Sequence, residues 1–383
     1  MRTLALKFRN LALFLVAYAV ALTLSRLRSD APLERILLVP AGKLGDVVCT
    51  TPVMRAVRAH LPHAKLYIRE YGGTNAALLA DSGLADGYIE AVTVRAYVAA
   101  LRRERIDTVL ITGPSLEDVA AALIARVPRI IAPRIVGGSS PLETRPYKML
   151  GRFVTLFPYR VGVYAPRERL RCLEPLGIIY DDITKKLGFS DAADEKMNRF
   201  LAEQGIDRAR DFVVGITPSA GHKIKEWPIE RFAEVADYLV SQYKARVIII
   251  GGPKDHEKVE KTKRHIQAAT GAIEAVGFSI DEIKALISKL HLFISVDTGP
   301  IYIAEAFAIP TIDITGPIDE KEQPPRGPLH RNVVPPQRVR PELFVLNARS
   351  YNRAEALRQV QSITVSLVKN EIDLLLADIK KQR

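Results

Sequence analysis

The sequence has 383 residues, enough for two or three domains with sizeable cores, so a peptide-sized module is excluded. Hydrophobic residues make up 48% and charged residues 26%, with 23 Gly and 24 Pro, a composition that excludes disordered and fibrous classes. Only two cysteines occur, Cys49 and Cys172, and they lie far apart. This excludes a disulfide scaffold and a Cys-built metal site, and it favours a reducing compartment.

The chain is basic, with 55 Lys and Arg against 43 Asp and Glu and a net charge of +12. The excess lies in residues 1–190, which hold 27 basic against 16 acidic residues, whereas residues 191–383 hold 28 against 27. Such a field favours an anionic partner. We expect no nucleic-acid partner, because no helix-turn-helix, zinc-finger or RNP pattern occurs and aromatic residues are only 7%.

Residues 1–30 form a separate segment, in which an apolar run over 11–24 is flanked on both sides by basic residues. The run is shorter than the roughly 20 residues that span a bilayer as a helix. Cationic flanks favour a membrane-associating helix that lies in an anionic interface. A cleaved signal peptide, a short membrane span and a helix packed on the protein's own core remain as alternatives. The flanking basic residues are Arg2, Lys7, Arg9, Arg26 and Arg28.

Short β-branched runs alternate with helical patterns from Arg35 onward, which predicts an α/β fold with parallel sheets covered on both faces. The runs divide into two Rossmann-like domains, residues 31–185 and 186–345, followed by amphipathic C-terminal helices in 346–383. The expected strands are 36–39, 65–68, 108–111 and 129–131 in the first domain, and 212–216, 246–250, 273–276, 292–295 and 311–314 in the second.

The first expected strand leads into Pro40-Ala-Gly-Lys-Leu-Gly-Asp46 and then a helix. Ligands of open α/β sheets bind at the carboxyl ends of the strands, so Asp46 is a candidate site carboxylate. Helix capping is the alternative role of Asp46. Gly42 and Gly45 do not complete a dinucleotide fingerprint.

In the second domain, strand 212–216 opens into a loop that carries Thr217, Ser219, Lys223 and Lys225 before a helix that Pro228 starts. Hydroxyls and lysines ahead of a helix N-terminus predict a phosphate-binding loop. Solvated surface lysines are the alternative. Trp227 is expected to be a packing anchor.

Strand 292–295 is followed by Asp297-Thr298-Gly299, the turn that starts the next helix. The unpaired N–H groups and dipole of that helix are suited to phosphate, with capping alone as the alternative. The following strand ends in Thr315-Gly-Pro317 on the same sheet edge.

Three motifs together resemble the ADP-heptose–lipopolysaccharide heptosyltransferase family, glycosyltransferase family 9. They are the strand and Gly-Asp-x-x-x-Thr-x-Pro pattern over 36–52, the Lys-x-Trp-Pro pattern over 225–228, and the Asp-Thr-Gly-Pro pattern over 297–304 with the later Thr315-Gly-Pro317. The sequence departs from the family at Tyr302, where His is usual.

The resemblance implies the GT-B fold, two Rossmann-like domains whose parallel sheets face each other across a cleft, here with an added N-terminal apolar helix. It implies an inverting, metal-independent glycosyltransferase that uses ADP-heptose as donor and needs no resident cofactor. Asp46 then corresponds to the catalytic base. The donor-binding residues implied are Thr217, Ser219, Lys225, Asp297, Thr298, Gly299 and Tyr302.

An anionic lipid-linked glycan, such as the lipopolysaccharide inner core, is the implied acceptor, and it suits the basic N-terminal half. Lys43, Arg145, Lys148 and Arg152 are the candidate acceptor contacts. The expected location is the cytoplasmic face of the bacterial inner membrane, with the protein bound to the membrane surface. A GT-B enzyme with another nucleotide-sugar donor or acceptor, and a catalytically silent membrane-associated homologue, are the alternatives.

Overall fold

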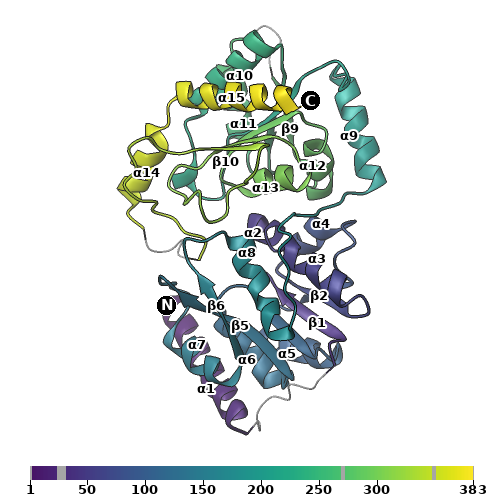
Figure 1. The fold of residues 1–383 in the computed structure, drawn as a ribbon, viewed down its shortest axis with the longest axis vertical. Coiled ribbons are helices and arrows are strands. Elements are labelled where there is room, and N and C mark those ends of the chain that lie inside the picture. The colour runs from purple at the N-terminus through teal and green to yellow at the C-terminus, as the bar shows by residue number, and fades with distance from the viewer. Residues whose placement is uncertain (1, 24–31, 269–271, 347–350, 383) are drawn as a thin grey trace. The chain divides into compact units, whose positions relative to one another are not determined.

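The computed structural model describes residues 2–23, 32–268, 272–346 and 351–382, which form two compact units (Figure 1). Unit 1 holds the residues up to Lys186 together with Val345 and Leu346, and unit 2 holds the remainder. Each unit is built around one six-stranded sheet in which every strand pair is parallel. The predicted α/β class with two parallel sheets is confirmed.

The sheet of unit 1 has the order β3-β2-β1-β4-β5-β6. Its strands are β1 (Arg35–Val39), β2 (Lys65–Glu70), β3 (Gly87–Glu90), β4 (Thr108–Ile111), β5 (Arg129–Val136) and β6 (Thr155–Arg160). The helices are α1 (Arg2–Thr23), α2 (Leu44–Val48), α3 (Thr51–His60), α4 (Thr74–Leu79), α5 (Val94–Arg103), α6 (Leu116–Ala125), α7 (Arg145–Leu150) and α8 (Ala165–Leu170), with the 3-10 turns η1 (Gly151–Phe153) and η2 (Arg171–Leu176).

The central strands β1 and β4 are apolar along nearly their whole length because helices cover both faces of the sheet. The chain winds outward from β1 to β2 and β3 and then returns to β4, so the winding direction reverses between β1 and β4. Such a switch point leaves a crevice at the carboxyl ends of the two strands. The loop that holds Asp46 begins there.

The sheet of unit 2 has the order β12-β11-β10-β7-β8-β9, and its switch point lies between β7 and β10. Its strands are β7 (Val213–Thr217), β8 (Arg246–Gly251), β9 (Ile273–Val276), β10 (Leu292–Val296), β11 (Thr311–Ile314) and β12 (His330–Val333). The helices are α9 (Asp191–Glu203), α10 (Ile229–Tyr243), α11 (His256–His265), α12 (Ile280–Ile287), α13 (Gly299–Ala306), α14 (Arg353–Ser362) and α15 (Val365–Gln382), with the 3-10 turn η3 (Lys223–Lys225).

The C-terminal helices α14 and α15 are part of unit 2, where α15 contacts α10, β11 and β12. Trp227 fastens the start of α10 to this C-terminal segment, since its indole N–H donates to the carbonyl of Ile363 at 2.9 Å and its ring meets Phe232 edge-on. Its side chain is almost wholly buried. The expected packing role of Trp227 is confirmed.

Helix α1 packs against α6 and α7 of unit 1 (Figure 1). Leu13, Phe14, Ala17 and Ala21 on its inner face are buried in the same apolar cluster as β1, β4 and α6. Helix α1 therefore contributes core packing, which was one of the alternatives that the sequence left open for residues 1–30. Within the described part of the chain, no helix combines the length and the apolar character needed to cross a membrane.

Candidate active site

Asp46 lies in α2, directly beyond the carboxyl end of β1. One carboxylate oxygen, Oδ2, accepts the backbone N–H of Lys43 at 2.8 Å, which satisfies a donor at the start of the short helix. The capping contact considered from the sequence is therefore present. It occupies one oxygen, and the side chain of Asp46 keeps 18% of its surface exposed.

Gly42 gives this carboxylate its space. Its φ of +84° is a backbone conformation that glycine adopts without strain, and a Cβ atom built on it would lie 1.9 Å from Oδ2 of Asp46. Any larger residue at position 42 would displace the carboxylate.

Arg169 of α8 holds the other oxygen of Asp46. Its guanidinium donates to Oδ1 at 2.7 Å and to the backbone carbonyl of the same residue at 2.8 Å, and the arginine side chain is fully buried. Two parallel bonds from a planar, buried group fix both the position and the orientation of the carboxylate. The sequence analysis missed Arg169, because 123 residues separate it from Asp46.

A cavity of about 270 Å³ adjoins the Gly42 loop at the carboxyl edge of the sheet of unit 1. Tyr71, Ser115 and Asp118 form its polar part, and Leu142 from the loop after β5 forms part of its wall. Asp118 accepts the Ser115 hydroxyl, and burial raises the pKa of its carboxyl. Asp46 does not line the cavity itself, but Gly42, which contacts the Asp46 carboxylate, does. The polar side chains give the cavity partners for hydroxyl groups.

In unit 2, Thr217 ends β7 at the switch point and Ser219 follows it in the loop. The Thr217 hydroxyl is buried and has no hydrogen-bond partner among the described residues. The Ser219 hydroxyl donates to Asp255 at 2.8 Å. Of the two predicted hydroxyls, only that of Thr217 is left without a partner in the described chain.

Lys225, Asp297 and Tyr302 form one cluster in unit 2. The Lys225 ammonium donates to Asp297 Oδ2 at 2.6 Å and to the Asp297 carbonyl at 3.3 Å, and the Tyr302 hydroxyl donates to Asp297 Oδ1. An ammonium has three N–H donors, so one donor of Lys225 is left for a further acceptor. The side chain of Lys225 is 23% exposed, whereas Asp297 and Tyr302 are buried.

Thr298 is the N-cap of α13 and Gly299 is its first residue. The Thr298 side chain makes no capping hydrogen bond, and both residues are partly exposed. Pro300, the second residue of α13, has no N–H, and the Ile301 N–H donates to the Thr298 carbonyl at 3.1 Å. The N–H of Gly299 is therefore the candidate backbone donor for an anion at the start of α13.

Asp313 of β11 adds a second acid to the cluster that the sequence analysis did not identify. In the sheet register it lies beside Ser295, which in turn lies beside Thr217. Asp313 is fully buried, and neither carboxyl oxygen has a hydrogen-bond partner among the described residues. Burial raises the pKa of Asp313 well above its usual value, and the nearby negative charge of Asp297 raises it further.

We expect stability to depend on pH through Asp313. Because the folded state holds the proton more tightly than the unfolded state, stability is retained below the usual Asp pKa of about 3.9 and falls as the pH rises above it. Asp313→Asn removes that ionisation, so its free energy of unfolding should exceed that of the wild type by about 1–3 kcal/mol at neutral pH. The two proteins should converge near pH 4. Urea unfolding across this range measures the difference, and parallel pH curves would contradict the assignment.

The predicted acceptor contacts lie on separate elements of unit 1. Lys43 is exposed at the start of α2, Arg145 and Lys148 lie on α7, and Arg152 lies on η1. Lys148 pairs with Glu143 at 3.1 Å. No hydrogen bond or ion pair between described residues joins the three basic residues of α7 and η1 to Asp46 or Lys43, so the structure does not bring the set together.

The residues that the structure describes include no group of three or more His, Cys, Asp or Glu side chains placed to hold a metal ion. The candidate site carboxylate at the carboxyl end of each sheet pairs with a basic side chain instead of other acids. Asp46 binds Arg169, and Asp297 binds Lys225. The two sites therefore pair acids with organic cations.

Comparison with known proteins fits this arrangement. Residues 170–344, which include the Lys225 loop, the Asp297 turn and Asp313, match the sequence model of glycosyltransferase family 9 (heptosyltransferase). This C-terminal part of the chain is similar to glycosyltransferase family 9. The chain is also 28% identical over 294 residues to lipopolysaccharide heptosyltransferase 3 of Escherichia coli K12, across 72% of the chain and 80% of the relative.

Solved structures show the same fold. ADP-heptose lipopolysaccharide heptosyltransferase II of Escherichia coli superposes with a TM-score of 0.69 at 17% identity, over 91% of this chain and all of the other. A family 9 glycosyltransferase of Veillonella parvula superposes with a TM-score of 0.65 at 21% identity, over 80% and 86%. The predicted GT-B fold is confirmed.

Proposed function

We propose that this enzyme transfers a heptose from ADP-heptose to the lipopolysaccharide inner core or a related anionic glycan, with inversion and without a metal ion. The observation that carries the proposal is the carboxylate of Asp46, oriented by buried Arg169 at the switch point of its sheet. The match of residues 170–344 to the family 9 model and the heptosyltransferase names of the relatives support the choice of sugar.

Asp46 acts as general base in the proposed reaction. It removes the proton from an acceptor hydroxyl while that oxygen attacks the anomeric carbon, and the bond from this carbon to the diphosphate oxygen breaks. ADP leaves with the electron pair, and the single displacement inverts the anomeric centre. A positioned base of this kind accelerates a reaction by roughly 10²–10⁴-fold.

The residues of unit 2 serve as the proposed donor site. The third N–H of Lys225, the hydroxyl of Thr217 and the N–H of Gly299 would bind the diphosphate and stabilise the charge that develops on it. Asp297 holds Lys225 in place, and Tyr302 and Asp297 position each other. Because Lys225 supplies positive charge and Thr217 and Gly299 supply hydrogen bonds to the diphosphate, the proposal requires neither a metal nor a cofactor.

The acceptor side is proposed to be unit 1, whose cavity beside Gly42 offers hydroxyl and carboxyl groups to a sugar. Residues 1–190 also carry most of the net positive charge, which suits a carboxylated or phosphorylated glycan. A lipid-linked acceptor places the enzyme at the cytoplasmic face of the bacterial inner membrane. Nucleic acid is not among the proposed partners.

Tyr302 motivates the second candidate, a GT-B transferase with a different nucleotide sugar. Incubating the purified enzyme with ADP-heptose and, separately, with UDP- and GDP-sugars should release ADP only from the first. Release of UDP or GDP would replace the proposed donor, and release of no nucleotide would favour a catalytically silent homologue. Excess chelator should leave the rate unchanged; loss of activity that Mg²⁺ restores would overturn the metal-free mechanism.

A further inference from the structure

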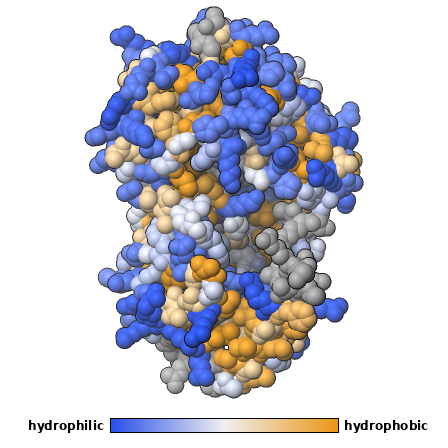
Figure 2. Space-filling model, turned by 180° about the vertical axis from the view of Figure 1, so that it is seen from behind, coloured by the Kyte–Doolittle hydropathy of each residue, from blue (hydrophilic) through white to orange (hydrophobic). Residues whose placement is uncertain are grey.

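The outward face of α1 is apolar and unpartnered in the described structure. Its outer stripe, which we define as Phe8, Leu11, Leu15, Ala19 and Leu22, follows the spacing of one helix face. Phe8 and Leu22 are each 64% exposed and Leu15 is 56% exposed. Figure 2 shows apolar side chains gathered over the lower right of the molecule, where α1 lies. Large exposed patches of this kind mark interaction sites.

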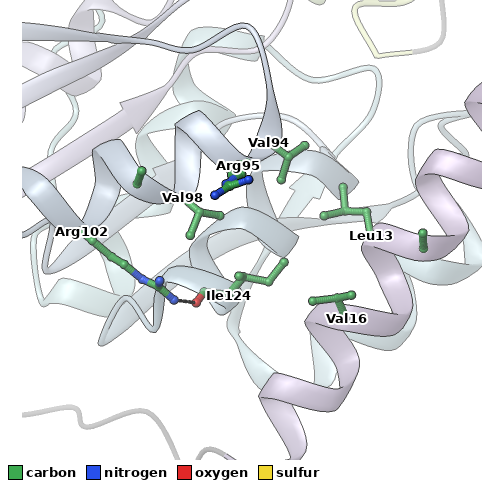
Figure 3. Close-up of a pocket in the computed structure, with 9 residues that line it drawn as sticks. Leu13, Val16, Val94, Arg95, Val98, Arg102 and Ile124 are labelled. Carbon is green, nitrogen blue, oxygen red and sulfur yellow. Dashed lines mark hydrogen bonds between the residues drawn. The ribbon is translucent and has the colours of Figure 1, made fainter.

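A groove beside the outer stripe extends the apolar surface. It has a volume of about 460 Å³ and lies between α1, α5 and the end of α6. Figure 3 shows Leu13 and Val16 of α1 facing Val94 and Val98 of α5 across it, with Ile124 at its base. The groove is lined almost entirely by aliphatic side chains, so it suits a hydrocarbon chain rather than a polar ligand.

Basic side chains flank this apolar surface on both sides. Arg95 and Arg102 of α5 line the groove, and Arg102 donates to the carbonyl of Ile124 at 2.6 Å (Figure 3). Arg145 and Arg152 lie on α7 and η1, next to α1, where Tyr18 meets Phe153 edge-on. None of these four arginines forms an ion pair with a described residue, and all are exposed.

We propose that the outer stripe, the groove and the flanking arginines dock the enzyme on an anionic phospholipid bilayer while α1 stays packed on unit 1. The arginines that flank the apolar surface favour a lipid bilayer over a second copy of the chain as the partner. A second copy of the chain meeting this face would bring like-charged arginines together, whereas lipid phosphates on either side of inserted apolar side chains complement them. We expect the inner face of α1 to stay packed on unit 1. Leu13, Phe14 and Ala17 are buried in the apolar cluster of that unit, and detaching α1 would expose them.

The docking surface connects to the acceptor side of unit 1. The loop after β5 supplies Leu142 to the cavity beside Gly42 and then continues directly into α7. A bilayer held at α1 and α7 therefore lies on the same unit as the cavity proposed for the acceptor. The inference rests on the proposed function only in the reason for docking, which is to bring a lipid-linked acceptor to the enzyme. Lipid binding itself requires no sugar transfer.

Cosedimentation of the full chain with phosphatidylcholine vesicles, with and without phosphatidylglycerol, tests the docking surface. Deleting α1 would remove core side chains, so point variants are the better probe. Leu11→Gln/Leu15→Gln/Leu22→Gln should reduce binding to anionic vesicles at least about tenfold. Ile179→Gln/Val339→Gln/Leu374→Gln changes three apolar residues elsewhere, which are between 48% and 96% exposed. It is the matched control and should bind as the wild type does.

A second pair of variants tests how much the flanking arginines contribute to binding of anionic vesicles. Arg95→Gln/Arg102→Gln should lower the affinity for anionic vesicles about fivefold for each charge removed and weaken its salt dependence. Lys261→Gln/Arg264→Gln removes two exposed charges from α11 of unit 2 and should have little effect.

The state of α1 on the membrane is tested by thiol reactivity. Cys49 and Cys172 are buried, so a maleimide reports on an introduced cysteine. Leu15→Cys should react in solution and become protected by anionic vesicles, whereas Ala17→Cys should stay protected in both conditions. Reaction of Ala17→Cys on vesicles would show that α1 detaches, which would overturn docking as proposed.

Two other outcomes would overturn the proposal. One is binding of the triple glutamine variant at wild-type affinity. The other is a wild-type protein that does not bind anionic vesicles but forms a dimer, while the triple glutamine variant is a monomer. Transfer to a water-soluble acceptor should be unchanged in the triple variant; absence of transfer in the wild type would reject the proposed function while the vesicle results still stand.

Discussion

Asp46→Asn is expected to reduce transfer by about 10²–10⁴-fold, which corresponds to roughly 3–5 kcal/mol of transition-state stabilisation. The single amide oxygen can accept only one of the two hydrogen bonds that the carboxylate oxygens now accept, from Lys43 N–H or from Arg169. The bond from Arg169 to the backbone carbonyl of residue 46 is kept and helps to hold the loop. ADP affinity should stay within a few-fold of the wild type, because the donor residues belong to unit 2. Steady-state transfer assays and calorimetric titration with ADP measure the two quantities.

Two glycine variants distinguish the effect of moving the Asp46 carboxylate from the effect of backbone strain. Gly42→Ala places a Cβ where Oδ2 of Asp46 now lies and should reduce turnover about a hundredfold or more, although Asp46 is still present. Gly177→Ala carries the same positive-φ strain, with a φ of +75°, but nothing lies within 4 Å of its added Cβ. It should lower stability by about 1 kcal/mol and leave turnover unchanged.

Loss of folding is the competing explanation for an inactive Asp46 variant. Arg169 is buried and loses its charged partner in Asp46→Asn, so we expect the unfolding free energy to fall by about 1–3 kcal/mol. Thermal unfolding should still be cooperative. Loss of ADP binding in a folded Asp46→Asn protein would assign Asp46 to the donor instead of the acceptor.

The central strands were predictable from the sequence and three edge strands were not. β1, β4, β7 and β10 are buried on both faces and appear in the sequence as unbroken apolar runs. The strands that the sequence analysis missed, β3, β6 and β12, each occupy a sheet edge. β6 contains Pro158, which an edge tolerates, and β12 reads His-Arg-Asn-Val. Edge strands need less burial, so their apolar signal is weaker.

The site was predictable only in part, for a similar reason. Asp46, Lys225 and Asp297 follow strand ends in recognisable motifs. Arg169 lies in a helix among other basic residues, and only the fold brings it to Asp46. Asp313 did carry a signal, because an acid within the apolar strand Thr311-Ile-Asp-Ile314 must be buried.

The sequence of residues 1–30 left several roles open because both faces of α1 are apolar. Periodicity distinguishes an apolar face from a polar one, and it fails where both are apolar. The structure shows that one face packs on the core. The remaining face is the one for which the bilayer is proposed.

Lys225→Ala is expected to weaken ADP binding and to slow turnover, each by about 10–100-fold. A charge-assisted hydrogen bond to phosphate contributes roughly 1.5–3 kcal/mol, which sets this range. The variant also leaves Asp297 with Tyr302 but without a cation, next to buried Asp313. Unbalanced negative charge at the diphosphate site should weaken ADP binding further, so the loss should diminish at high salt.

Lys223→Ala is the matched control for this experiment. Lys223 lies two residues away on the same 3-10 turn, carries the same charge and is exposed, whereas Lys225 is held on Asp297. If charge acts on nucleotide binding only in a general way, the two variants should lose ADP affinity to the same extent. If Lys225 belongs to a specific diphosphate site, Lys223→Ala should bind ADP nearly as the wild type does. A Lys225→Ala protein that is less stable yet binds ADP with wild-type affinity would show that Lys225 only supports Asp297. The proposed stabilisation of the leaving diphosphate would then rest on the Thr217 hydroxyl and the N–H of Gly299.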